Sequence, residues 1–503
     1  MAAERLIGVD IGTQGTKAAL FDRAGVCLAE AFEKSELLHP EPGAIEEDPE
    51  AQAASVLRTI RQCLQASGSG PGSVAAIGLD GQMAGLIGVG EDGRAVTPYD
   101  SWLDTRCAPY IAVMEREAGE EITRQSGGPP SFNHGPRILW WMHERPQVFA
   151  RIRSFVQPGG YAAMRLGGLS GREAFIDPTY LHFSGFADSQ RRRWDPELCR
   201  RFSLDPARLP RIVDSQQVVG SLSAEAAAAC GLSQGTPVVA GCGDTAASFL
   251  SCGATREGIS VDVAGTASVF ATTTASLRPD VEHRVLACGH SATPGLWHPY
   301  AYINGGGMNL EWFRKDIAAG SGFEELDRQA EALVPGEDDP LFIPHLGGRV
   351  CPSQPALRGA WLGLAWNHGR AHLYRAVLEG VALEYAVYLD ILRRLDPAFR
   401  SSEIRVTGGG GRNALWNRIK ADALGIPVRV LARPEGAPLG AALLAGFGIG
   451  LFPSLDQAAA AWIRVGQRVD PDPGRRETCD RRMQRYQEAL LALNQWGLET
   501  KRE

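Results

Sequence analysis

The sequence predicts an α/β protein in which two halves repeat one plan. Residues 6–22, LIGVDIGTQGTKAALFD, read as an apolar strand, a Gly/Thr turn and a returning strand. Residues 258–274, GISVDVAGTASVFATTT, have the same layout. The length of 503 residues exceeds what one core supports, and it fits two large domains or three smaller ones. A chain of this size has room for a cleft between its domains.

Composition narrows the expected partners and compartment. Hydrophobic residues make up 44% of the chain and charged residues 22%, which is typical of a folded globular protein. The net charge of −7 leaves no basic footprint, so we expect neither nucleic acid nor membrane as a partner. The ten cysteines form no CxxC pair and no Cys–His cluster at zinc spacing, which favours reduced thiols in a cytoplasmic protein. No basic and apolar leader begins the chain, and no later apolar run reaches membrane-spanning length.

The turn of the first hairpin carries groups suited to phosphate and metal. Its glycines permit close approach of a ligand to the backbone, and its threonines offer hydroxyls. Lys17 offers a cation, and Asp10 stands where the first strand ends. Lys17 leads into more strand and not into a helix, so the segment is not a Walker loop. An ordinary Gly-containing hairpin is the alternative interpretation.

Strands and helices alternate through the rest of the first half. Residues 25–32 extend the hairpin into a third strand, and residues 46–64 are expected to form a helix with an acidic, proline-bearing start. A strand at 74–79 ends in the polar sequence DGQMAG at 80–85, and α/β folds place ligands after such strand ends. A strand at 237–240 opens onto GCGDTAAS, in which a Gly-flanked Asp precedes a helix of small residues.

Two charged segments of the first half have simple structural interpretations. Residues 101–107, SWLDTRC, suggest an Asp–Arg pair beside a packed Trp, with direct substrate contact as the alternative. The run RRRW at 191–194 is expected to be a solvated face, because nothing around it extends the positive patch.

The second hairpin differs from the first at one telling position. When Gly265-Thr266 is aligned with Gly12-Thr13, Asp10 falls on Val263. Only the first hairpin then keeps a carboxylate, which suits a nucleotide clamped between two hairpins with a metal on one side. The later elements are expected in this order: a Gly turn and amphipathic helix at 304–317, a long helix at 371–395, a strand at 404–407, the turn GGGGRN at 408–413 with a helix after it, a small-residue helix at 435–448 and a closing helix at 475–496.

Taken together, these segments resemble the FGGY family of carbohydrate kinases, most closely its xylulokinase-like branch, over essentially the whole chain. The motifs DIGTQGTK, GCGDTAAS, AGTAS, GGGGRN with Trp416 and Asp422, and EGAPLGAA stand in the family's order. The family's C-terminal signature is met by Gly359, Trp361, Gly363, Leu364, His372, Leu373, Ala376, Val377, Leu378 and Glu379.

The resemblance implies two duplicated actin-like ATPase (ribonuclease H-like) domains with an interdomain cleft. It divides the chain into residues 1–250, which would bind the sugar, and residues 251–503, which would bind ATP. It implies ATP and Mg2+ as cofactors and transfer of the γ-phosphate to a terminal hydroxyl of a small ketose, with D-xylulose as the first candidate. Alternatives are another ketose or polyol such as ribulose or erythritol, a degenerate sugar-binding regulator, and an actin or chaperone relative driven by ATP alone. The sequence does not determine the oligomeric state, and a homodimer is compatible with it.

The resemblance also implies a role for single residues. Asp244 resembles the general base that takes the proton of the sugar hydroxyl, with a helix N-cap as the alternative. Asp10 resembles the residue that positions the metal. The sugar pocket is expected at Gln82, Met83, Ala84, Phe132 and Asp244, although the first four could equally be core packing. The ATP-binding residues are expected to be Thr13, Gln14, Gly15, Lys17, Gly265, Thr266, Gly307, Glu311, Gly409, Gly410 and Asn413.

The chain departs from the family's pattern around the sugar. Xylulokinases typically read Gln-Met-His-Gly where this chain has Ala84 in place of the imidazole. Arg137 stands for a Lys, Gly159-Gly160 for a Lys-Asp pair, and residues 176–179 read IDPT in place of Ser-Asp-Ala-Ser. Loss of one designed hydrogen bond to a hydroxyl changes discrimination by orders of magnitude, so the sugar is open.

Overall fold

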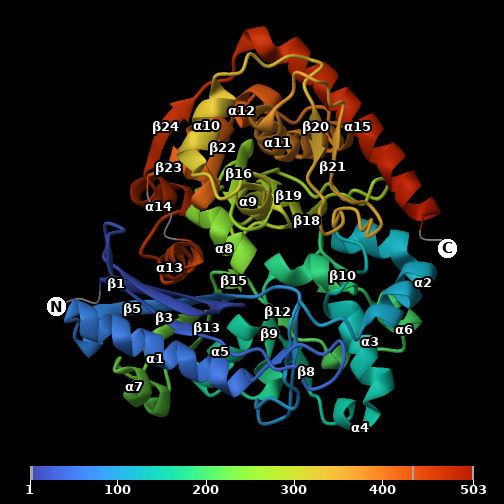
Figure 1. The fold of residues 1–503 in the computed structure, drawn as a ribbon. Coiled ribbons are helices and arrows are strands. Elements are labelled where there is room, and N and C mark those ends of the chain that lie inside the picture. The colour runs from blue at the N-terminus through green and yellow to red at the C-terminus, as the bar shows by residue number, and fades with distance from the viewer. Residues whose placement is uncertain (1–3, 433–435, 501–503) are drawn as a thin grey trace.

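The structure is a computed structural model that describes residues 4–432 and 436–500. It contains two seven-stranded sheets with helices packed on them. Figure 1 shows the first sheet in the lower, mostly blue to green part of the molecule and the second in the upper, yellow to red part. The predicted α/β class with two domains is confirmed.

The first sheet places the opening hairpin at its centre. Its order is β13-β14-β5-β1-β2-β3, and β15 also pairs with β5. β1 is antiparallel to β2 and parallel to β5, so the ends of β1 and β5 meet at one edge of the sheet. The strands are β1 (Arg5–Gly12), β2 (Gly15–Phe21), β3 (Cys27–Lys34), β5 (Val74–Gly81), β13 (Val218–Ser221), β14 (Pro237–Val239) and β15 (Cys242–Gly243).

Six strands of the second sheet repeat the six-strand path of the first, and β18 extends the second sheet beyond it. Its order, β18-β19-β17-β16-β22-β23-β24, places an antiparallel hairpin beside a parallel pair, as the first sheet does. β16 therefore corresponds to β1, β17 to β2 and β22 to β5, which confirms the predicted duplication. The strands are β16 (Ile259–Ala264), β17 (Ser268–Thr272), β18 (Ala287–His290), β19 (Trp297–Ile303), β22 (Glu403–Thr407), β23 (Val428–Leu431) and β24 (Val465–Val469).

Helices cover the outer face of each sheet. α1 (Pro49–Ser67), α5 (Pro158–Gly167) and α7 (Ala224–Cys230) share a core with the first sheet. α11 (Arg370–Leu395), α12 (Ala414–Leu424) and α15 (Arg476–Glu499) share a core with the second. The predicted start of the first helix was wrong, because Glu46–Glu47 form a short strand, β4, paired with β7 (Tyr99–Asp100). Asp48 caps α1 by accepting a hydrogen bond from the backbone N–H of Glu50, so the helix begins at Pro49.

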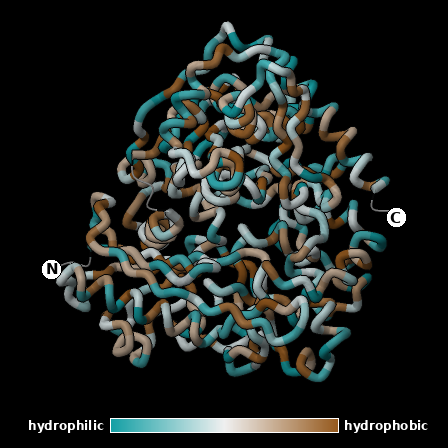
Figure 2. Tube along the Cα trace, viewed as in Figure 1, coloured by the Kyte–Doolittle hydropathy of each residue, from teal (hydrophilic) through white to brown (hydrophobic). Residues whose placement is uncertain are grey.

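Two helices lie between the sheets and join the domains. α8 (Asp244–Ser251) and α13 (Ala437–Gly448) share one core with strands of both sheets. α13 is buried on every side, as expected of a helix that is apolar all round, and it is among the hydrophobic segments in Figure 2. Side chains at Gly8 and Gly78 would collide with its backbone, and one at Gly440 would collide with α8. The small residues predicted at 435–448 thus permit close packing, although position 435 lies outside the described residues.

The arginine run at 191–193 is exposed to solvent, as predicted. Arg191 and Arg193 bond with Asp188, and Arg192 bonds with Asp214, with 41–69% of each arginine side chain exposed. Within residues 4–432 and 436–500, no helix has the length and hydrophobicity needed to cross a lipid bilayer.

Candidate active site

Three carboxylates meet at the edge of the first sheet that faces the domain junction. Asp10 on β1 is in register with Asp80 on β5, and Cys242 on β15 is in register with Asp80 on its other side. Asp244 follows β15 directly and is the first residue of α8. Alternation along β1 puts Asp10 on the same face as Leu6, which packs in the core shared with α8 and α13. The sequence motifs 6–22, 80–85 and 241–248 therefore converge on one site.

Burial and mutual repulsion raise the pKa values of these three carboxyl groups above the ordinary value of aspartate. Burial raises the pKa of Asp244 to about 7, and the charge of Asp10 adds to the effect. Burial also raises the pKa of Asp10, and it raises the pKa of Asp80 well above its usual range with the help of the Asp10 charge. Two hydrogen bonds, from the N–H and the hydroxyl of Thr245, both end on Oδ1 of Asp244. Asp244 is thus poised to exchange a proton near neutral pH.

The donor set at Asp10 and Asp80 fits a hard cation. Oδ1 of Asp10 and both carboxylate oxygens of Asp80 are buried, and no N–H or hydroxyl group of the described residues donates to them, so the two carboxyl groups have each other as neighbours. Mg2+ is usually held by one or two carboxylates together with water and substrate phosphates. In the part of the chain that the structure describes, no three His, Cys, Asp or Glu side chains form a metal cage of their own. Asp10 and Asp80 therefore fit a magnesium ion that takes its remaining ligands from water and from the substrate phosphates.

A chain of hydrogen bonds links the first hairpin to the predicted sugar loop. The indole N–H of Trp102 donates to Oγ1 of Thr13 at 2.8 Å, and the Thr13 hydroxyl donates to Oε1 of Gln82 at 3.1 Å. The amide of Gln82 donates in turn to Glu47 at 2.9 Å, and Gln52 donates to the other oxygen of Glu47. Gln82 is 1% exposed, and its side-chain amide is held by two partners, Thr13 in the first turn and Glu47 on β4.

Two side chains from α3 (His134–Glu144) hold the loop around Ala84. His134 Nε2 donates to the carbonyl of Met83 at 2.6 Å, and Arg137 donates to the carbonyls of Ala84 and Phe132. Met83 packs against Gly243, next to Asp244. Phe132 is 40% exposed. The structure therefore joins residues 82–84 to the backbone of Phe132 through Arg137, and it places Met83 next to Asp244.

The polar residues of the first turn have distinct surroundings. Gln14 is exposed at its tip, and Gly15 has a φ of 154° with no room for a side chain beside the Glu33 carbonyl. Lys17 lies opposite Asp10 but forms an ion pair with Glu30 at 2.8 Å. Thr16 is buried against Ser55 on the other face of the sheet, so its hydroxyl is not offered to a ligand.

The second turn gathers five of the eleven predicted nucleotide residues, which are Gly265, Thr266, Gly307, Gly409 and Gly410. The N–H of Gly307 donates to the carbonyl of Gly265 at 2.9 Å, and the next N–H donates to the carbonyl of Thr266. Gly307 belongs to α9 (Gly306–Trp312), which therefore starts directly over the turn. The four-glycine turn after β22 lies against the end of β16, where Gly410 packs on Ala264, whereas a side chain at Gly409 would meet open space.

Two predicted nucleotide residues use their side chains elsewhere. Oδ1 of Asn413 caps α12, and its amide donates to Asp327 at 2.9 Å. Glu311 is paired with Arg314 one turn along the chain, and its side chain is 53% exposed. In this arrangement neither side chain is free to reach into the turn.

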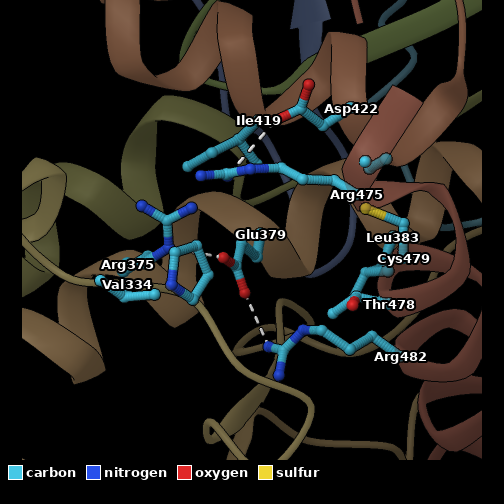
Figure 3. Close-up of a pocket in the computed structure, with 13 residues that line it drawn as sticks. Val334, Arg375, Glu379, Leu383, Ile419, Asp422, Arg475, Thr478, Cys479 and Arg482 are labelled. Carbon is cyan, nitrogen blue, oxygen red and sulfur yellow. Dashed lines mark hydrogen bonds and ion pairs between the residues drawn. The ribbon is translucent and has the colours of Figure 1, made fainter. Parts of the chain in front are cut away.

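A cavity of 220 Å³ among α11, α12 and α15 is separate from the predicted site (Figure 3). Its charged residues pair with one another, since Glu379 accepts from Arg375 and Arg482 while Asp422 pairs with Arg475. None of the residues lining it belongs to the predicted site. Glu379 and Asp422, which stand in family motifs, thus join helices of the second domain.

Two site residues were missed by the sequence analysis. Asp80 was taken as part of a polar strand end, and only its register with Asp10 reveals the pair. The signal that could have found it is a charged residue directly after the apolar run VAAIGL, at the same strand end as the sugar loop. Trp102 is not packed as predicted but 45% exposed, with its N–H on Thr13, while the predicted pair of Asp104 and Arg106 is present at 2.9 Å.

Comparisons with known proteins cover nearly the whole chain. The model of the FGGY family of carbohydrate kinases, N-terminal domain, matches residues 5–251, and that of its C-terminal domain matches residues 261–449. A xylulose kinase of Bacillus subtilis (strain 168) is 27% identical over 464 residues, covering 91% of each chain. A glycerol kinase of Aromatoleum aromaticum is 29% identical over 477 residues, covering 93% of this chain and 94% of the relative. The crystal structure of xylulose kinase from Rhodospirillum rubrum superposes with a TM-score of 0.90 at 28% identity, covering 98% and 99% of the two chains.

Proposed function

The chain belongs to the FGGY family of carbohydrate kinases, and from this premise we propose that it transfers the γ-phosphate of ATP to a terminal hydroxyl of a small ketose. As a member of this family it is a sugar kinase, a phosphotransferase with an alcohol acceptor. D-xylulose, which would give D-xylulose 5-phosphate, is the first candidate because xylulose kinases are similar over their full length. Another ketose such as ribulose, or a polyol such as erythritol, is the second, because a glycerol kinase is equally similar and position 84 carries only a methyl group.

The observation that carries this proposal is the placement of Asp244. Its carboxyl stands at the start of α8, beside the sugar-loop residue Met83 and within the electrostatic reach of Asp10. A base with a pKa near 7 can accept the proton of an alcohol as the hydroxyl oxygen attacks, and it can release that proton afterwards. A bond forms between the sugar oxygen and the γ-phosphorus, the bond from the γ-phosphorus to the bridging oxygen breaks, and ADP leaves.

The rest of the reaction requires positioning more than covalent chemistry. We assign sugar binding to residues 1–250, where Met83 of the loop at 82–84 lies beside Asp244, and ATP binding mainly to residues 251–503. The turn at 265–266 and the glycines at 307, 409 and 410 offer backbone groups to the nucleotide, and the turn at 13–15 with Lys17 faces its phosphates. When bound, Mg2+ would neutralise charge on the phosphate oxygens, and Asp10 would hold it. Closure of the two domains would exclude water as a competing acceptor.

Asp244→Asn tests the base directly. The amide keeps the shape of the side chain but accepts no proton, so kcat should fall about 100-fold to 10,000-fold. Binding of ATP, followed by isothermal titration calorimetry, should be nearly unchanged because Asp244 lies in the sugar half of the site. A variant with near wild-type turnover would contradict the assignment.

The acceptor is identified by measuring ADP release with a coupled assay across ketoses, polyols and sugar acids in the presence of Mg-ATP. We expect at least one acceptor to raise turnover well above the rate with ATP alone. Ala84→His supplies the imidazole that xylulokinases carry, and it should shift kcat/KM between acceptors by an order of magnitude or more. Turnover that no acceptor raises would favour a sugar-binding regulator.

A further inference from the structure

Asp80 is a buried carboxylate without hydrogen-bond donors. It is fully buried, and no N–H or hydroxyl group of the described residues donates to its oxygens, so its hydrogen-bonding neighbour is another acid, the carboxyl of Asp10. Asp177 in the same domain is 2% exposed, yet it accepts bonds from the N–H and hydroxyl of Thr179 and from the hydroxyl of Ser215. Burial of an ionisable group without a partner is costly. The surroundings of Asp80 are therefore incomplete in a way that those of Asp177 are not.

The neighbours of Asp80 make a cation the missing partner. Asp10 lies beside it in register, and Oδ1 of Asp10 also lacks a partner, so three unpartnered oxygens come together. Lys17, the cationic residue opposite Asp10, is already paired with Glu30. Asp244 adds a further negative charge nearby. The charge of Lys17 lowers the pKa of Asp10, but no ion pair with an arginine or lysine is formed by Asp10, Asp80 or Asp244 among the described residues. Oxygen ligands from such carboxylates are those that a hard divalent cation prefers.

We propose that Asp80 and Asp10 together ligate one divalent cation and that the chain binds this cation before it binds ATP. Magnesium needs oxygen ligands and commonly takes one or two from carboxylates, so the pair is sufficient without a cage. A site with Asp10 alone would depend on nucleotide phosphates for most of its affinity, whereas a second carboxylate gives it affinity of its own. The cation site itself does not depend on the proposed function. Only the identification of the natural cation as Mg2+ rests on the proposed kinase activity.

The test is a titration of the full-length protein with Mn2+ in the absence of nucleotide, with free Mn2+ measured by electron paramagnetic resonance. We expect one Mn2+ per chain, displaced by Mg2+. Asp80→Asn removes the charge and one oxygen ligand, and it should weaken Mn2+ binding about tenfold or more. Asp177→Asn is the matched control, because it alters an equally buried carboxylate that already has donors, and it should bind Mn2+ as the wild type does.

Two outcomes would overturn the proposal. The first is an Asp80→Asn protein that binds Mn2+ as tightly as the wild type, which would mean that Asp80 carries a proton and only contacts Asp10. The second is a wild-type protein that binds no Mn2+ without nucleotide. Asp80→Ser, a smaller side chain, replaces Asp80→Asn if circular dichroism shows the latter unfolded. If no sugar stimulates ADP release while Mn2+ binding still depends on Asp80, the proposed function fails and the cation site stands.

Discussion

The two hairpins of the repeat each carry an aspartate, Asp10 partly buried and Asp262 fully buried, and the two aspartates have opposite surroundings. Asp10 on β1 points into the domain junction, and one of its oxygens has no partner. Asp262 on β16 points the other way, where Lys420 lies at 2.5 Å and the hydroxyl of Tyr385 at 2.8 Å. Both Asp262 and Lys420 are fully buried. The first hairpin thus leaves its charge available, and the second neutralises its charge inside the fold.

The difference arises because Asp262 stands one position further from the glycine of its turn than Asp10 does. Asp10 stands two positions before the glycine of its turn, and Asp262 stands three positions before Gly265. Successive residues of a strand face opposite sides, so this single step moves the carboxylate from the junction to the core. The position that matches Asp10 is Val263, opposite Val269, where the first hairpin has Asp10 opposite Lys17. The short motif Val-Asp, present in both hairpins, is therefore no guide to function without the turn as a reference.

The largest expected effects differ between the two aspartates: substitution of Asp10 should lower kcat, and substitution of Asp262 should lower stability. Asp10→Asn should lower kcat by about 100-fold or more, because several kcal/mol of transition-state stabilisation depend on the metal. Its thermal stability should not fall, since a buried charge without a donor is removed. Asp262→Asn should lose about 3–5 kcal/mol of unfolding free energy because Lys420 is left buried and unpaired. Steady-state kinetics gives kcat of both variants, and urea denaturation gives their free energies of unfolding. An equal loss of kcat in both variants would contradict the proposed difference between the two aspartates.

A double substitution tests whether the second pair is only structural. Asp262→Leu with Lys420→Met replaces a buried ion pair by apolar side chains of similar size, and such replacements are often neutral or stabilising. We expect the double variant to regain most of the stability that Asp262→Asn loses, to within about 2 kcal/mol of the wild type. Its kcat should stay near the wild-type value, as measured in the coupled assay. A stable double variant without activity would instead give Asp262 a catalytic role.

Local patterns predicted the repeat and the strand ends, whereas the roles of Asp10 and Asp244 were inferred from the family resemblance. Alternation and Gly/Thr turns depend on neighbours in the sequence, so both hairpins could be found without a structure. The position of α13 and the pairing of Asp80 with Asp10 depend on contacts between distant strands, which no local pattern encodes. The exposure of Trp102 was mispredicted for the same reason, because its partner Thr13 lies 89 positions away. The assigned roles of the site residues remain predictions.

A smaller effect concerns the pH dependence of the open site. Asp244 has a pKa of about 7 in the folded protein against an ordinary value of 3.8, so the folded state binds this proton more tightly than the unfolded state. Its contribution to stability is present below about pH 4 and is lost as the pH rises to about 7. Without metal, Asp244→Asn should therefore exceed the wild type in stability by roughly 1–4 kcal/mol at pH 8, and by less at pH 5. Urea denaturation in the presence of EDTA at both pH values measures the difference, and a gap independent of pH would contradict it.

The smallest effect is expected when a residue of the second hairpin is placed at the matching position of the first. Lys17→Val copies Val269, and the fold of the second hairpin shows that an apolar residue suits this position. The lost ion pair with Glu30 is partly exposed and contributes at most about 1 kcal/mol, so stability should change little. If Lys17 leaves Glu30 to meet the phosphates of ATP, KM for ATP should rise about fivefold to tenfold in Lys17→Val. Glu30→Gln frees the lysine and should leave KM unchanged or lower it. An unchanged KM in Lys17→Val would restrict Lys17 to its ion pair with Glu30 and leave the turn's backbone as the phosphate ligand.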